Sequence, residues 1–172
     1  MHDRVSTFRT SLGWCAIVGC GAQLRALTFG HPNAAAALSG LKPDLVDGAK
    51  PSVWNRSLIN RITAALEGEP DQFEDVEVDL EHLTPFSRRV IARCRRILWG
   101  ETCTYGELAA AAGRPGAARA VGRVMSQNRT PLVVPCHRVI GSSGKLVGFS
   151  APQGIKLKRR LLALELAANC MA

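Results

Sequence analysis

The sequence has no long apolar run, and it has little acidic character in its second half. No stretch approaches the roughly 20 consecutive apolar residues that a membrane-spanning helix requires. The first residues, MHDRVSTFRTSLGW, also lack the apolar core of a secretory signal. Apolar residues make up 47% of the 172 residues and charged residues 21%, as is typical of a folded globular chain. We therefore expect a cytoplasmic protein without membrane contact, associated with the nucleoid if its source is bacterial.

Acidic residues almost disappear between residues 85 and 160, where only Glu101 and Glu107 occur. The net charge of the chain is +8, and the basic residues are concentrated in this same span. They are Arg88, Arg89, Arg93, Arg95, Arg96, Arg114, Arg119, Arg123, Arg129, Arg138, Lys145, Lys156, Lys158, Arg159 and Arg160. Such a distribution predicts a polyanionic partner, nucleic acid above all, although positive charge could also serve only to keep a protein in solution.

Cysteine never occurs in the paired CxxC spacing that is typical of structural zinc sites, so we predict no metal site. The six cysteines are Cys15, Cys20, Cys94, Cys103, Cys136 and Cys170. Without an export signal, reduced thiols are expected rather than disulfides. Cys15, Cys20 and Cys94 stand in apolar patterns, which predicts that they pack as small hydrophobic side chains.

Residues 1–82 have the pattern of a small sheet-and-helix domain and contain no chemical motif. Alternation of apolar and polar residues around turn signals predicts an antiparallel hairpin or small sheet over 8–30. Residues 30–51, rich in Pro, Gly and Ala, are expected to form a loop. Apolar residues at helical spacing predict a helix over 52–66, and the alternation of Val76, Val78 and Leu80 with acids predicts a strand.

Residues 83–172 predict a second, mainly helical domain. Thr84 suits an N-cap and Pro85 suits the first helical position, so a helix is expected over 84–98. Its apolar stripe is Phe86, Val90, Ile91, Cys94, Ile97 and Leu98. A terminal helix is expected over 155–168.

A helix-turn-helix is predicted between these two helices. Thr104 and Glu107 form a capping box, so a helix begins at Tyr105, and a turn at 114–116 leads to a second helix over 117–127. The second helix is rich in small residues, which would allow close approach to a nucleic-acid groove or, equally, close packing of helices.

The stretch PLVVPCHRVIG, residues 131–141, sets Cys136 and His137 inside an apolar run that predicts a buried strand. Only a thiolate is a strong nucleophile, so a reactive Cys136 would need a base. Neighbouring residues in a strand face opposite ways, so His137 would act through a water. Glu165, the one acid after Glu107, could orient it. A structural cysteine and a core histidine remain the alternatives.

The segment PCHRVIGSSGKLVGFS, with TYGELA and GAARAVG before it, resembles the O6-alkylguanine-DNA alkyltransferases (methylated-DNA–protein-cysteine methyltransferases). The resemblance implies a mixed α/β (α+β) fold, with a small N-terminal domain over 1–82 and a helical DNA-binding and catalytic domain over 83–172. It implies repair of DNA by irreversible, single-turnover transfer of an alkyl group from O6-alkylguanine, and from O4-alkylthymine, to Cys136. The expected protein is a monomer that needs no cofactor and binds the minor groove of double-stranded DNA.

The resemblance also implies a role for each site residue. Cys136 accepts the alkyl group. His137 removes the proton of the Cys136 thiol through a water, and Glu165 polarises His137. Tyr105 donates a proton towards guanine N3, and Asn128 links the recognition helix to the active-site strand. Substrate binding is assigned to Met125 and Pro131 as pocket lining and to the main chain of Cys136, Val139 and Ser150. DNA binding is assigned to Arg119, which fills the gap left by a flipped nucleotide, and to Thr104, Ala118, Ala120 and Gly122.

The sequence departs from the family pattern after Ser150. Residues 151–154, APQG, stand where a glycine pair is usual and predict a longer loop with an altered pocket width. Phe149 replaces a tyrosine, and Arg129 stands where proline is common. Two other functions stay open. One is a lesion-binding or regulatory module with an inert Cys136, and the other is a cysteine hydrolase, which would turn over repeatedly.

Overall fold

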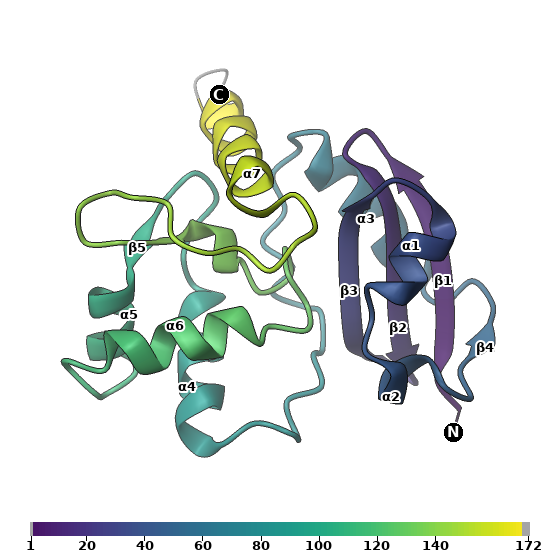
Figure 1. Cartoon of the computed structure of the whole chain (residues 1–172), viewed down its shortest axis with the longest axis horizontal. Coiled ribbons are helices and arrows are strands. Elements are labelled where there is room, and N and C mark those ends of the chain that lie inside the picture. The colour runs from purple at the N-terminus through teal and green to yellow at the C-terminus, as the bar shows by residue number, and fades with distance from the viewer. Residues whose placement is uncertain (1, 170–172) are drawn as a thin grey trace.

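The computed structural model describes residues 2–169 and joins a sheet-containing half to a helical half (Figure 1). The sheet consists of β1 (Arg4–Thr10), β2 (Gly13–Cys20), β3 (Gln23–His31) and the short β4 (Lys50–Pro51), in the order β3-β2-β1-β4. The first three strands are antiparallel neighbours, whereas β4 runs parallel to β1. The small sheet predicted over 8–30 is therefore confirmed.

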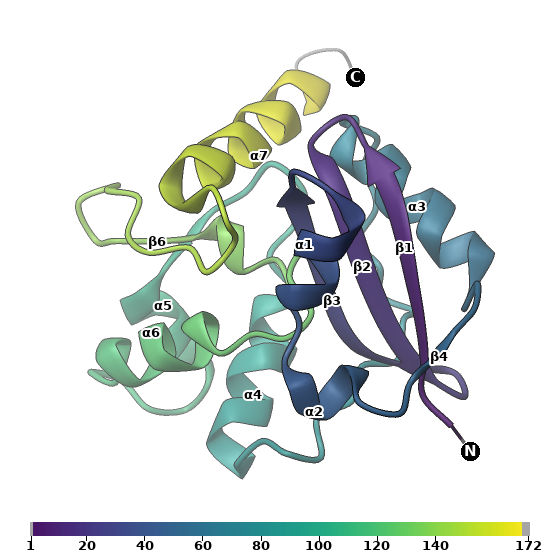
Figure 2. The ribbon, with the colours of Figure 1, turned by 45° about the vertical axis from the view of Figure 1, so that its right-hand side comes forward.

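Helices cover both faces of this sheet (Figure 2). Alternate residues of β2 point to opposite sides because strand side chains have a period of two. Ile17 packs in the cluster that includes α3 (Arg56–Leu66), and Ala16 packs in the cluster that includes α1 (Ala34–Ser39) and α2 (Pro43–Val46).

Two predictions for this half are wrong. The expected loop over 30–51 contains α1 and α2, and α1 begins because Asn33 accepts a hydrogen bond from the backbone of Ala36 at 2.8 Å. The expected strand over 76–80 is only an isolated bridge. Leu24 at the sheet edge bonds the backbone of Glu77 and Asp79, and the chain then turns at 81–83.

The helical half contains α4 (Pro85–Cys94), α5 (Tyr105–Ala111), α6 (Ala118–Ser126) and α7 (Gly154–Asn169). The N-cap at Thr84 and the capping box of Thr104 with Glu107 are confirmed. The first helix ends at Cys94, four residues early, and Leu98 is 53% exposed rather than part of the buried stripe. No helix in residues 2–169 is long and apolar enough to cross a membrane.

The two halves share a hydrophobic core. Leu132 and Val133 from the helical half, with Leu157 and Leu161 of α7, pack in the same buried cluster as the strand residue Phe29. The helix α7 therefore lies across the junction (Figure 1). The division at residue 82 stays a prediction, because this core is continuous across it.

The cysteines of the described chain carry free thiols. Cys15 and Cys94 are fully buried, as predicted, whereas Cys20 at the end of β2 is only partly buried. Cys170 lies outside the described residues.

Candidate active site

Cys136 lies in a tight turn and not in a strand. Residues Cys136–Arg138 form a 3-10 helix, and the two-residue strand β6 (Val139–Ile140) begins only after it, beside β5 (Cys103–Thr104). Pro135 precedes the turn, and proline cannot donate to a sheet ladder, so the apolar run stops there. The predicted alternation of Cys136 and His137 across a strand is therefore wrong, since successive side chains of a 3-10 helix are roughly 120° apart.

The Cys136 side chain lines a cavity of about 430 Å³. The other lining residues are Tyr105, Gly122, Met125, Ser126, Val147, Gly148, Phe149 and Ser150. Cys136 is only 4% exposed, so the thiol is reached through this cavity. The walls come from α5, α6 and the segment 147–150, which lies in no helix or strand.

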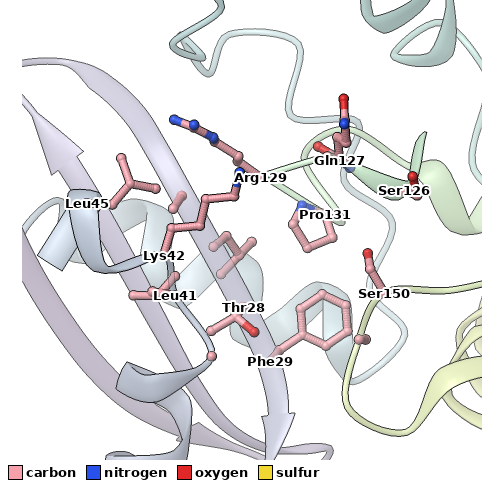
Figure 3. A pocket seen from close by; sticks show the side chains of 15 residues that line it. Thr28, Phe29, Leu41, Lys42, Leu45, Ser126, Gln127, Arg129, Pro131 and Ser150 are labelled. Carbon is pink, nitrogen blue, oxygen red and sulfur yellow. The ribbon is translucent and has the colours of Figure 1, made fainter. Parts of the chain in front are cut away.

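Two residues expected at the pocket lie elsewhere. Pro131 lines a separate cavity of about 200 Å³ between the halves of the molecule (Figure 3). Val139 is fully buried, and its carbonyl oxygen accepts a hydrogen bond from Lys158 Nζ at 2.6 Å. Met125 and Ser150 do line the cavity with Cys136, as expected.

Asn128 connects the end of α6 to the thiol. Its Nδ2 donates to Cys136 Sγ at 3.2 Å and to the Val134 carbonyl at 3.0 Å. The backbone N–H of Thr130 donates to its Oδ1 at 3.0 Å, which fixes the amide orientation. Burial raises the pKa of the Cys136 thiol, although the hydrogen bond from Asn128 acts in the opposite direction. The thiol therefore needs a base before it can act as a nucleophile.

A buried ion pair stands behind His137. His137 Nε2 lies 2.6 Å from Glu165 Oε1, and Arg138 Nε donates to both oxygens of the same carboxylate at 3.1 and 3.0 Å. The backbone N–H of Gly100 donates to Oε2 at 3.1 Å. Burial alone would raise the pKa of Glu165, but the hydrogen bonds with His137 and Arg138 and the charge of Arg138 outweigh burial and lower this pKa to about 2.

The ionised carboxylate of Glu165 fixes the state of His137. A carboxylate only accepts, so Nε2 of His137 must be the donor. Burial lowers the pKa of His137, so the ring is neutral at pH 7 and Nδ1 keeps a lone pair. Nδ1 is buried and makes no hydrogen bond to any group of residues 2–169. The ring can therefore accept a proton at Nδ1 while Glu165 supports the resulting charge.

Two buried cations of this site were wrongly assigned to the basic surface from the sequence. Arg138 is 2% exposed, and Lys158 is fully buried. Lys158 Nζ bonds the carbonyl oxygens of Val139 and Val147 at 2.6 and 3.2 Å. The proximity of Arg138 to the PCH motif was the one available signal for its role, whereas nothing in the local pattern distinguished Lys158.

Tyr105 is the first residue of α5 and faces the cavity. Its hydroxyl donates to the Val147 carbonyl at 3.2 Å, and Lys158 Nζ lies 5.9 Å from its ring centre. Burial raises the pKa of Tyr105, so the hydroxyl keeps its proton at neutral pH. A proton donor therefore stands at the cavity wall.

Comparison with known proteins decides the family. Residues 85–167 match the family described as 6-O-methylguanine DNA methyltransferase, DNA binding domain. The methylated-DNA–protein-cysteine methyltransferase of Mycobacterium bovis is 49% identical over 107 residues, which is 62% of each chain. That of Methanosarcina acetivorans is 42% identical over 110 residues, covering 64% of this chain and 68% of the relative. The chain belongs to the methylated-DNA–protein-cysteine methyltransferase family.

Solved structures of this methyltransferase family are similar over nearly the whole chain. The O6-methylguanine methyltransferase of Mycobacterium tuberculosis is 35% identical with a TM-score of 0.80, over 96% of this chain and 94% of that one. The enzyme of Pyrococcus kodakaraensis is 27% identical with a TM-score of 0.73, over 94% and 98%. A structure of the M. tuberculosis protein in complex with DNA is 34% identical, with a TM-score of 0.79 over 96% and 94%. The predicted mixed α/β (α+β) fold is thus confirmed.

The helix α6 presents one apolar and one open face. Val121, Val124 and Met125 are buried, whereas Arg119 and Ala120 are exposed. Ala118 is half-buried at the start of the helix, and Gly122 lines the cavity. Thr104 is half-buried, and its hydroxyl is engaged with Glu107 in the capping box. Among the residues predicted to bind DNA, Gly122 thus lines the cavity of Cys136, and Arg119 and Ala120 are exposed on the same helix. The contacts of all these residues with DNA stay a prediction.

Proposed function

We propose that this protein repairs DNA by moving an alkyl group from O6 of guanine, and less often from O4 of thymine, onto Cys136. One observation carries the proposal. The Cys136 side chain lines a cavity, and its Sγ accepts a hydrogen bond from Asn128 Nδ2 at 3.2 Å. The next residue, His137, is hydrogen-bonded to the buried carboxylate of Glu165. Family membership supports the same reaction.

The proposed chemistry balances without a cofactor. The thiol proton passes through a water to Nδ1 of His137, and the resulting thiolate attacks the alkyl carbon. A carbon–sulfur bond forms as the bond between carbon and O6 breaks, and the electron pair of that bond stays with the guanine. Tyr105 gives a proton to guanine N3 and regains one from solvent, while His137 releases its own. The net exchange is one alkyl group for one proton.

Each molecule acts once in this scheme. The product is a thioether at Cys136, and a thioether carbon is not released by water under physiological conditions. The protein is therefore consumed in equal amount to the lesions that it repairs. A cysteine hydrolase would instead regenerate its thiol through an ester intermediate and release many products per molecule.

The alkylated base must leave the duplex to reach a buried thiol. Base flipping costs a few kcal/mol, and less for a poorly paired base. We infer that α6 enters the minor groove with its small residues Ala118, Ala120 and Gly122, and that Arg119 fills the space of the extruded nucleotide. The exposed basic side chains would bind phosphates. We also propose that the protein acts as a monomer on DNA, in the cytoplasm or nucleoid.

The deciding experiment measures the mass of the peptide that contains Cys136. The protein is incubated with duplex DNA carrying one methyl-labelled O6-methylguanine, then digested and analysed by mass spectrometry. We expect one methyl group on Cys136, in a ratio of one per protein molecule, and none in Cys136→Ser. Tight binding with unchanged mass would instead identify a lesion sensor, and release of several products per molecule would identify a hydrolase.

A further inference from the structure

The lid of the Cys136 cavity is attached to the other half of the molecule. We use the term lid for residues 147–153, which run from the cavity wall to the start of α7 and lie in no helix or strand. Such a segment has no ladder or helical hydrogen bonds to hold its position. The position of the lid therefore depends on what its side chains and carbonyl groups touch.

The strand β3 makes two of these contacts at its C-terminal end. Gln153 Nε2 donates to the carbonyl oxygen of Gly30 at 3.1 Å. The ring of Phe149 packs on that of Phe29 at a tilt of 55°, with 6.5 Å between the ring centres. Phe149 and Ala151 also pack against the core cluster that contains Phe29. The middle and the C-terminal end of the lid thus rest on the sheet. The first residue of the lid, Val147, is held from α5 and α7, because its carbonyl oxygen accepts hydrogen bonds from Tyr105 and Lys158.

Gly30 allows this close approach. Its φ is +84°, and a Cβ built there would lie 2.9 Å from Leu157 Cδ2 and 3.4 Å from Gln153 Nε2. Only glycine adopts this backbone without strain and leaves room for α7 and the lid. The end of β3 is therefore a closely fitted support for the lid.

The cavity between the two halves lies directly behind the lid. Its volume is about 200 Å³, and it shares Ser126 and Ser150 with the cavity that contains Cys136. Figure 3 shows Phe29, Pro131, Ser126 and Ser150 around this space. A lid that moved away from β3 would therefore join the two spaces, so the lid contacts control the room available beside the thiol.

We propose that β3 positions the lid through the ring of Phe29 and the carbonyl oxygen of Gly30, which contact Phe149 and Gln153, and so sets the largest alkyl group that Cys136 can accept. The inference rests on the proposed alkyl transfer and deepens it. Phe29 and Gln153 are positioning residues, because both act through the lid without lining the Cys136 cavity. With the contacts intact, the lid restricts the cavity to small groups. When one of the contacts between the lid and β3 is removed, the lid can move away from the cavity, so larger alkyl groups fit beside Cys136.

The test compares alkyl groups of two sizes. Rates of transfer from free O6-methylguanine and free O6-benzylguanine are measured for the full chain, for Gln153→Ala and for Phe29→Leu, by the mass of the Cys136 peptide. The free bases remove any effect on DNA binding. We expect the ratio of benzyl to methyl rate to rise roughly fivefold in Gln153→Ala, as loss of one hydrogen bond would allow. Phe29→Leu should change the ratio in the same direction.

A matched control is Gln23→Ala, which removes an exposed glutamine from the opposite end of β3. Its ratio should equal that of the unaltered chain. If Gln153→Ala leaves the ratio unchanged, or slows both substrates equally, the lid contacts do not determine size and the inference is overturned. If the unaltered chain transfers neither group, the proposed function itself fails. The two failures are therefore distinguishable.

Discussion

Nε2 of His137 lies 2.6 Å from Oε1 of Glu165, and the exposed fractions of the two side chains are 0% and 2%. Arg138 pairs with the same carboxylate at 3.0 Å and is equally buried. One negative charge therefore serves both an imidazole and a guanidinium away from solvent. The arrangement leaves Nδ1 of His137 as the nitrogen that can accept a proton, and it holds α7 against the Cys136 turn.

Replacing Glu165 with glutamine should damage both stability and reaction. Glutamine is nearly isosteric but leaves Arg138 as an uncompensated buried charge, which costs about 3 kcal/mol of unfolding free energy. The rate of methyl transfer should fall at least tenfold because protonated His137 loses its counter-charge. Urea unfolding and the initial rate of Cys136 methylation measure the two effects. A variant as stable and as fast as the unaltered chain would contradict the role of the pair.

Acidification should weaken the fold in two stages. The pKa of His137 is lowered from its ordinary 6.5, so the unfolded chain takes up the proton first, and stability is lost as the pH falls below 6.5. The pKa of Glu165 is about 2 instead of 4.5, so its contribution is complete above pH 4.5 and is lost as the pH falls towards 2.

The comparison of the unaltered chain with His137→Gln isolates the first stage. Burial also lowers the pKa of His31 and His82, but these residues are common to both proteins and cancel in the difference. Urea unfolding between pH 8 and pH 5 should show a steeper loss for the unaltered chain, by at most about 1.4 kcal/mol per pH unit. Parallel curves would show that His137 does not titrate differently in the two states.

Tyr105→Phe should slow transfer with little loss of stability. Phenylalanine keeps the ring beside Lys158, and the Val147 carbonyl retains its hydrogen bond from Lys158 at 3.2 Å. The proton donor alone is lost, and removal of a general acid typically costs roughly 100-fold in rate or more. Single-turnover rates on O6-methylguanine DNA measure the effect. An unchanged rate would exclude Tyr105 as the proton donor.

Arg119→Ala should slow repair of duplex DNA and leave transfer from free O6-methylguanine unchanged, because Arg119 is exposed on α6 and outside the cavity. The matched control is Arg159→Ala, which removes an exposed arginine of α7. This control should leave the rate on free O6-methylguanine unchanged and should lower the rate on duplex DNA only as far as one lost phosphate contact weakens binding. Both proteins should bind less tightly as salt rises. If Arg119→Ala slows transfer from duplex DNA and from the free base equally, Arg119 does not fill the space of the extruded nucleotide.

Local signals in the sequence were sufficient for most helices. Thr84 begins α4 because its hydroxyl accepts from the backbone of Ser87, and Thr104 with Glu107 begins α5 in the same way. The missed helix α1 had a comparable signal in Asn33, hidden within a segment whose composition suggested a loop. The strand expected over 76–80 failed for a different reason. Strand pairing depends on a partner, and only Leu24 was available there.

The sequence by itself determined the candidate reactive groups, which are a cysteine, a histidine and a distant glutamate. It also determined a capped helix pair with small residues and the motifs that mark the family. Tertiary structure decided where these groups act. In the folded chain Arg138 and Lys158 are buried, and Cys136 begins a 3-10 helix. The lid packs against the end of β3. These outcomes join residues far apart in the chain, such as Gly30 with Gln153, and packing between distant segments leaves no periodic trace in either segment alone.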